Sequence, residues 1–114
     1  MGQLRWEIVP RSSITSLRTP KGVLIADADK LAFPLNIRPW KEGDWMHPLG
    51  MRGRKKLSDM FTDLKWSAPE KERAEVIELD GSHVAALLCE RIDDSIKVDE
   101  STRRVLVLDY SSMI

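Results

Sequence analysis

The chain has 114 residues, of which 42% are hydrophobic and 32% are charged, and its 18 basic residues balance its 18 acidic residues. These values are typical of one globular domain with a modest core, and the zero net charge argues against a strongly basic nucleic-acid-binding tail but says nothing about local charged patches. The longest apolar run, residues 84–89, is far too short to span a membrane, and no hydrophobic segment follows Met1 that could form a signal peptide.

The first third of the chain predicts three short strands. Residues 4–8 alternate between apolar and polar side chains, which indicates a half-buried strand with Trp6 in the core. Residues 10–20 are rich in proline, serine and threonine and predict a loop. The apolar run 23–26 predicts a central strand followed by a short turn at 28–30, and residues 35–38 predict another strand that Pro39 ends.

Two helices are predicted in the middle of the chain. The clearer one is expected to begin near Lys55. Apolar residues recur along one face at helical spacing, at Leu57, Met60, Phe61 and Leu64. Ser67 and Glu70 have the spacing of a capping box, with Pro69 in the first turn, and they predict a second helix over residues 69–75.

The last third returns to strands. Residues 76–79 and 83–88 predict a hairpin with a two-residue turn at Asp80-Gly81, and residues 105–108 predict a final strand. Asp93 is expected in a solvated turn. Cys89, the only cysteine, is expected to be a buried, inert thiol. The prediction is an α+β domain with about six short strands and two short helices.

Catalytic chemistry has little support in the sequence. His47 and His83 are the only histidines, and neither lies in a nucleophile motif; a G-x-S-x-G motif, a P-loop and an H-E-x-x-H motif are all missing. Two histidines and one cysteine do not have the spacing of a zinc site. We therefore expect no catalytic residue, no metal site and no cofactor in this domain.

Binding is better supported, because the charges are segregated along the chain. Residues 38–56 hold six basic and two acidic residues, whereas residues 90–100 hold two basic and five acidic residues. Four cations fall within residues 52–56: Arg52, Arg54, Lys55 and Lys56. They form either a solvated loop or a phosphate site. Cations at a helix N-terminus cost roughly 0.3–1 kcal/mol each. Residues that destabilise their own helix in this way are typical of functional sites. Gly53 would also let a phosphate approach the backbone at the helix N-terminus.

The aromatic residues of the same loop leave alternatives open. Trp40 and Trp45 flank Lys41, and each could either stack on bases or close a small core. For Trp45 we favour the core position. For Trp40 the two alternatives are equally supported. His47 could bind a phosphate or, as we favour, brace the loop. Asp44 is expected to shape the loop by accepting backbone N–H groups or by pairing with Arg38.

The motifs of this region resemble those of the C-terminal domain of bacterial tRNA(Ile)-lysidine synthetase. The matching stretches are I-R-P-W at 37–40, G-D at 43–44, H-P-L-G-M at 47–51 and K-K-L-S-D-M-F at 55–61. Weaker agreement at 91–94 and 97–98 extends the match to a signature core of residues 35–98, and residues 25–30 agree weakly before it. The chain departs from the family after Lys65, where many relatives carry a Pro-Arg pair.

The resemblance implies that residues 1–114 form a single accessory domain that binds tRNA. It implies a small layered, β-sandwich-like α+β fold, of a type shared with a domain of the phenylalanyl-tRNA synthetase β chain. The parent protein would be a cytoplasmic, ATP-dependent carbon–nitrogen ligase that attaches L-lysine to the wobble cytidine of tRNA(Ile). In the family that chemistry belongs to an N-terminal domain with an S-G-G-x-D-S loop. This chain has no such loop and is expected to be non-catalytic alone.

The expected tRNA- and phosphate-binding residues are Arg38, Trp40, Lys41, His47, Arg52, Arg54, Lys55, Lys56 and Lys65. The expected partners are tRNA(Ile) and the catalytic N-terminal domain of the same protein, with a homodimer as a further candidate and no membrane. The alternative is a structural docking or dimerisation module without RNA contact. A third hypothesis, an independent small enzyme, would require a pocket with converging titratable groups.

Overall fold

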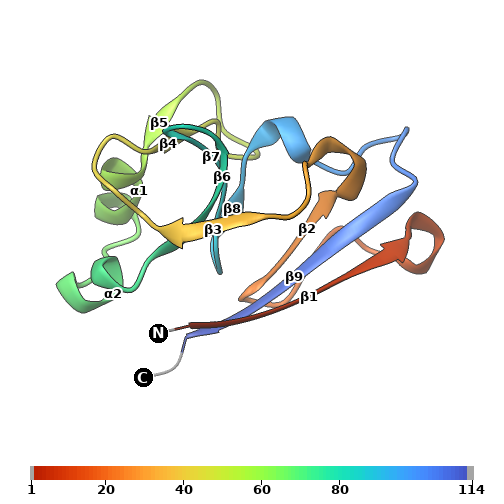
Figure 1. Cartoon of the computed structure of the whole chain (residues 1–114), viewed down its shortest axis with the longest axis horizontal. Coiled ribbons are helices and arrows are strands. Elements are labelled where there is room, and N and C mark those ends of the chain that lie inside the picture. The colour runs from red at the N-terminus through yellow and green to blue at the C-terminus, as the bar shows by residue number, and fades with distance from the viewer. Residues whose placement is uncertain (1, 113–114) are drawn as a thin grey trace.

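A computed structural model describes residues 2–112 of the chain and shows an α+β domain built from two sheets and two α-helices (Figure 1). Sheet A has the antiparallel order β1-β9-β2, with the bounds β1 (Gly2–Pro10), β9 (Arg104–Ser112) and β2 (Val23–Asp27). Sheet B has the order β3-β6-β7-β4-β5, with β8 paired to β7. Its strands are β3 (Asn36–Pro39), β4 (Trp45–Met46), β5 (Lys55–Lys56), β6 (Glu75–Asp80), β7 (His83–Leu87) and β8 (Arg91–Ile92).

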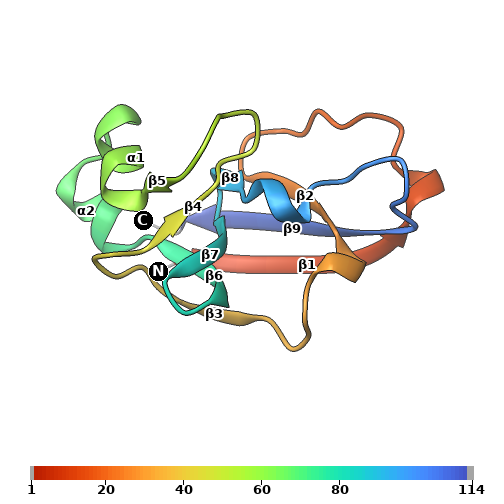
Figure 2. The same cartoon turned by 90° about the horizontal axis from the view of Figure 1, so that it is seen from above.

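The helices α1 (Leu57–Asp63) and α2 (Ala68–Glu72) gather at one end of the molecule beside sheet B, on the left in both views (Figures 1 and 2). The α+β class and the layered arrangement predicted from the sequence are therefore confirmed. Among residues 2–112, no helix combines the length and the apolar composition that crossing a membrane requires.

Sheet B separates two hydrophobic cores. The first core lies between the sheets and contains, among others, Ala26, Ile77, Ala86, Leu106 and Leu108. The second core lies between sheet B and α1 and contains, among others, Met46, Leu57, Phe61, Val76, Val84 and Leu87. Because β7 contributes to both cores, four of its five residues are buried, which explains its uninterrupted apolar sequence.

The predicted helices form for the reasons read from the sequence. The α1 stripe is buried at Leu57 and Phe61, but Leu64 is exposed because the helix ends at Asp63. The Ser67 side chain and the Glu70 carboxylate form the predicted capping box at the start of α2. This reciprocal pair satisfies two N–H groups that the helix itself cannot.

All six predicted strands are present, but three strands were missed because β4, β5 and β8 have only two residues each. The hairpin turn is Gly81-Ser82 and not Asp80-Gly81, since Asp80 pairs with His83. The prediction that Trp6 lies in the core is wrong. Trp6 faces the core side beside Leu108, but β1 is an edge strand, so Trp6 is 52% exposed and contacts Phe33.

Candidate nucleic-acid interface

The shape of the loop between β3 and β4 is set by one buried ion pair. Asp44 is only 1% exposed, and its two carboxylate oxygens accept hydrogen bonds from the two terminal nitrogens of Arg38, each at 2.9 Å. The Lys41 N–H also donates to Asp44, at 2.8 Å. This geometry confirms the predicted structural role of Asp44.

Arg38 belongs to the scaffold of the site. Its Nε donates to Glu78 at 2.8 Å, and one terminal nitrogen also donates to the Gly81 carbonyl at 3.1 Å. The hydrogen bonds to Asp44 raise the pKa of Arg38 above its ordinary value, against the lowering effect of burial. Because the guanidinium already has these partners, Arg38 positions the loop and offers little to a phosphate.

Trp40 closes the second core. Its ring meets Phe61 edge-on at 4.8 Å, and Trp66 stacks on the same phenyl ring at 5.0 Å. The backbone N–H of Trp40 donates to the Ala74 carbonyl at 3.1 Å, and this bond ties the loop to the end of α2. The sequence left two alternatives open for Trp40, and in the structure this residue packs against the second core.

Trp45 has the opposite surroundings, so the favoured core interpretation for this residue is wrong. Its ring stacks on the His83 imidazole, with centroids 4.1 Å apart and planes within 8°. The guanidinium carbon of Arg54 also lies over the Trp45 ring, 3.7 Å from its centroid. Trp45 is half-buried within this Arg54–Trp45–His83 stack and joins neither core.

The pleat of β5 sends its two lysines to opposite faces of sheet B. Lys56 stands opposite Trp45, beside the stack, whereas Lys55 stands opposite the buried Met46. Lys55 therefore turns towards α1 and forms an ion pair with Asp63. Lys56 is exposed and has no ion-pair partner within residues 2–112.

The start of α1 differs from the phosphate site that the sequence suggested. Lys55 and Lys56 form β5, the helix begins at Leu57, and it extends for only seven residues. The Leu57 N–H already donates to the Asp44 carbonyl at 3.0 Å. The basic character of this surface therefore comes from side chains and does not require the helix terminus.

His47 connects the loop to the acidic segment after β8. Its backbone N–H donates to Asp93 at 2.6 Å, and its carbonyl accepts from the Asp94 N–H at 2.7 Å. The His83 Nε2 lies 2.9 Å from the same Asp93 oxygen. The backbone of His47 thus braces the loop, while its side chain is 42% exposed, and a phosphate contact by the side chain stays a prediction.

The prediction that Asp93 lies in a solvated turn is wrong, because its side chain is fully buried. Burial favours a raised pKa for Asp93, but hydrogen bonds from Ser95, the His47 N–H and His83 outweigh it and lower the pKa below the ordinary value. Asp93 therefore stays ionised. Sequence reasoning missed Trp45, His83 and Asp93 as members of one site, since no local spacing connects them.

The remaining predicted cations occupy different places. Arg52 is exposed in the turn that precedes β5, near Arg54 in sequence, and Lys41 is exposed in the turn before β4. Lys65 follows α1 at the end away from β5, with a left-handed φ of 58°. The structure thus places Arg54 and Lys56 at the stack, with Arg52 two residues before Arg54 in the same turn, and leaves Lys65 beyond the far end of α1.

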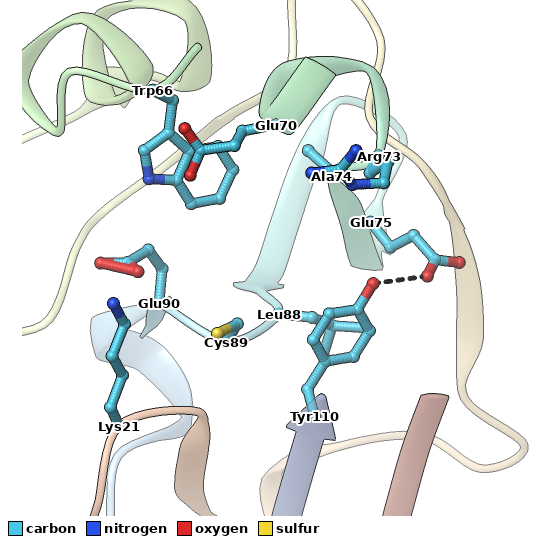
Figure 3. A pocket seen from close by; sticks show the side chains of 10 residues that line it. All are labelled: Lys21, Trp66, Glu70, Arg73, Ala74, Glu75, Leu88, Cys89, Glu90 and Tyr110. Carbon is cyan, nitrogen blue, oxygen red and sulfur yellow. Dashed lines mark hydrogen bonds between the residues drawn. The ribbon is translucent and has the colours of Figure 1, made fainter. Parts of the chain in front are cut away.

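A separate pocket of about 240 Å³ lies between α2, the turn after β7 and the end of β9 (Figure 3). Its lining includes Lys21, Trp66, Arg73, Cys89, Glu90 and Tyr110. Burial, and then the charge of Glu90, raises the pKa of the Cys89 thiol, which is the opposite of an activated nucleophile. Tyr110 donates to Glu75 at 2.8 Å, and burial together with this bond raises its pKa. The surroundings of this pocket therefore raise the pKa of both side chains that could otherwise act as nucleophiles.

The chain is similar in sequence to several tRNA(Ile)-lysidine synthases. It is 49% identical to that of Parabacteroides distasonis over 79% of the chain and 44% identical to that of Bacteroides thetaiotaomicron over 71% of the chain. It is 35% identical to that of Dehalococcoides mccartyi over 94% of the chain. The chain spans only 20%, 19% and 22% of the length of these relatives. No family model matches it.

The fold is also known from a solved structure, the crystal structure of a TILS C-terminal domain. The two structures agree with a TM-score of 0.80 over 99% of this chain and 85% of that chain, at 19% sequence identity. This agreement shows a shared fold for the whole domain, and the sequence relatives supply the family. The chain belongs to the tRNA(Ile)-lysidine synthase family, in which it corresponds to the C-terminal domain.

Proposed function

We propose that this domain is a tRNA-binding accessory domain of a tRNA(Ile)-lysidine synthase. The parent enzyme would use ATP to attach L-lysine to the wobble cytidine of tRNA(Ile) in the bacterial cytoplasm. ATP and L-lysine would bind to the catalytic N-terminal domain of the same protein. The names of the relatives support this assignment, and the modest share of their length that the chain spans fits an accessory role.

One observation carries the RNA-binding role: the Arg54–Trp45–His83 stack with Lys56 beside it. RNA-binding surfaces combine cations, which hold phosphates, with flat groups, on which unpaired bases stack. Here an exposed guanidinium covers an indole ring, and an exposed lysine lies opposite that indole on the neighbouring strand. The same surface thus offers both kinds of contact.

The predicted binding residues divide into two groups on this surface. Arg52, Arg54 and Lys56 would contact phosphates directly, with Lys41 and the exposed edge of His47 as further contacts. The others support the surface or lie beside it: Arg38 and Trp40 are scaffold, Lys55 is paired with Asp63, and Lys65 lies beyond α1. Phosphate contacts position an RNA without reading its sequence, so specificity would rest with the whole enzyme.

The test is the salt dependence of tRNA binding by the 114-residue chain, measured by fluorescence anisotropy of labelled tRNA(Ile). We expect the double change Arg54→Ala with Lys56→Ala to weaken binding about tenfold or more and to reduce the slope of log K against log salt by roughly 1.5–2. Both follow from the loss of two phosphate contacts.

The control is Arg103→Ala. Arg103 is an exposed cation directly before β9, whose start lies at the other end of the molecule from β4 and β5 (Figure 1). Its removal changes the net charge but should leave the slope within error. An unchanged slope in the double variant, or an equal loss in Arg103→Ala, contradicts the assignment.

A docking or dimerisation role is the second candidate, and one observation favours it. Trp6 and Phe33 are both exposed, and their rings lie 6.1 Å apart beside the free edge of β1. Exposed apolar pairs of this kind often mark protein contacts. Sedimentation of the chain and of Trp6→Ser tests the dimer: association that Trp6→Ser abolishes supports it, and a monomer at every concentration excludes it.

A further inference from the structure

The fold brings three potential metal ligands together from three separate strands. His47 follows β4, His83 begins β7 and Asp93 follows β8, and one ligand atom of each lies within 4.8 Å of the other two. We propose that His47, His83 and Asp93 form a Zn²⁺ site with one coordination position left open. This inference rests on the geometry of the domain and does not depend on tRNA binding.

The charge around Asp93 supports a bound cation. Its carboxylate is fully buried, and within residues 2–112 the only basic side chains within 4.0 Å of it are the two histidines. Its Oδ2 is held by the N–H and the hydroxyl of Ser95, whereas its Oδ1 faces both imidazole rings. Buried charges are normally paired or bound to a metal, because removing them from water is costly. A divalent cation between the two rings and this oxygen would bind the carboxylate directly.

Two of the three ligand distances require only small movements, and the third, between the two histidine nitrogens, is within 4.8 Å and must shorten by at most about 1.4 Å. The Nε2 atom of His83 lies 2.9 Å from the Asp93 Oδ1, and the Nδ1 atom of His47 lies 3.9 Å from the same oxygen. Tetrahedral zinc with bonds of about 2.0–2.2 Å needs its ligand atoms about 3.4 Å apart. The first distance must therefore lengthen by about 0.5 Å, which replaces the His83–Asp93 hydrogen bond, and the second must shorten by a similar amount.

The surroundings hold two of the ligands in position and leave the third free to adjust. The His83 ring is fixed by its stacking on Trp45, and the second Asp93 oxygen is held by the N–H and the hydroxyl of Ser95. The His47 side chain is 42% exposed, so it can turn and an ion can enter. Outer contacts that orient ligands in this way are characteristic of metal sites.

The ligand types determine which ion the site should take. Two imidazoles and one carboxylate are typical ligands of Zn²⁺, whereas Mg²⁺ and Ca²⁺ prefer oxygen ligands in larger number. Three protein ligands leave a fourth tetrahedral position for a water molecule. The Trp45 ring contacts both His83 and Arg54, so the site is a neighbour of the basic surface.

Calorimetric titration of the chelator-treated 114-residue chain with zinc chloride tests the site. We expect one Zn²⁺ per chain and at least about a tenfold weaker affinity in His47→Gln and in His83→Gln. His47→Gln is the more informative variant because its side chain is half-exposed and its backbone bond to Asp93 is kept; circular dichroism should show an unchanged fold. Cys89→Ser removes the one thiol of the chain, which is not part of the proposed site. This variant should therefore bind Zn²⁺ as tightly as the unmodified chain.

Two further measurements locate the ion. Co²⁺ in place of Zn²⁺ should give the intense visible absorption of a tetrahedral site. Nitrogen NMR of the histidine rings should show the signals of His47 Nδ1 and His83 Nε2 shifting with Zn²⁺. Equal affinity in the unmodified chain and in the double variant His47→Gln with His83→Gln overturns the proposal, as does binding that Cys89→Ser abolishes or that leaves both ring signals in place.

Discussion

Replacing Asp44 by asparagine tests the ion pair that shapes the basic loop. The change keeps the size of the side chain but removes its charge, and it puts an amide NH₂ where one oxygen now accepts a hydrogen bond. Asp44 accepts two bonds from Arg38 at 2.9 Å and one from the Lys41 N–H at 2.8 Å, and asparagine has only one oxygen to accept them.

The expected loss of stability follows from burial. Removing one partner of a buried ion pair costs about 3–5 kcal/mol, because the other charge is left without compensation. Arg38 keeps its bond to Glu78, and its side chain is 17% exposed, so the low end of that range, about 3 kcal/mol, is expected. With a urea m-value of about 1.5 kcal/mol/M, this corresponds to a fall of about 2 M in the unfolding midpoint.

Urea unfolding followed by far-ultraviolet circular dichroism measures this shift, and Asp63→Asn provides the matched control. Asp63 is paired with Lys55, but its side chain is 59% exposed, so the loss should stay below about 1 kcal/mol. A fall of less than about 0.5 M for Asp44→Asn would refute the argument, because it corresponds to less than about 0.8 kcal/mol. Equal shifts in the two variants would show that burial does not decide the cost.

Two further predictions concern a glycine and the cysteine. Gly22→Ala should destabilise the domain by about 2–4 kcal/mol, since φ is +89° and the new Cβ would lie 2.9 Å from the Tyr110 carbonyl oxygen. Gly50→Ala, at φ +83° in open space, should cost only about 1 kcal/mol, and equal losses in thermal unfolding would contradict the steric argument. Burial raises the pKa of Cys89, so its reaction with a thiol reagent at neutral pH should be slower than in urea, and its rate should continue to rise with pH beyond the point where the rate in urea levels off. Equal rates in the folded and unfolded chain would contradict this.

The features that could be predicted from the sequence depend on contacts between near neighbours. The Ser67–Glu70 capping box joins residues three positions apart, and the Arg38–Asp44 pair joins residues six positions apart. The α1 stripe likewise follows from helical spacing. In these cases the local chain brings the partners together, so the residue types and their spacing already contain the interaction.

The missed features depend on contacts that the chain makes only after folding. Asp93 reads as a turn residue, yet it is buried because the His47 N–H, 46 positions earlier, donates to it. The alternation of apolar and polar residues around Trp6 correctly predicts that Trp6 lies on the core-facing side of β1. Only the sheet order shows that β1 is an edge strand. The strands β4 and β5 are too short for a periodic pattern and exist through their pairing at Trp45 and Lys56.

The central place of β9 in sheet A has a consequence for the order of folding. Both β1 and β2 pair with β9 and not with each other, in registers that join Gly2 to Ser112 and Val23 to Asp109. During synthesis these two strands leave the ribosome long before their partner. Sheet B and its helices occupy the continuous segment 36–92 and can form earlier, with shorter loops to close.

The basic surface is therefore assembled from the part of the chain that can fold first. The first core, which needs Leu106 and Leu108 of β9, is completed last. Until then β1 and β2 have no strand between them, and the apolar face of sheet B that sheet A later covers remains in water. A nascent chain halted before β9 would present that face to chaperones and to other unfinished chains.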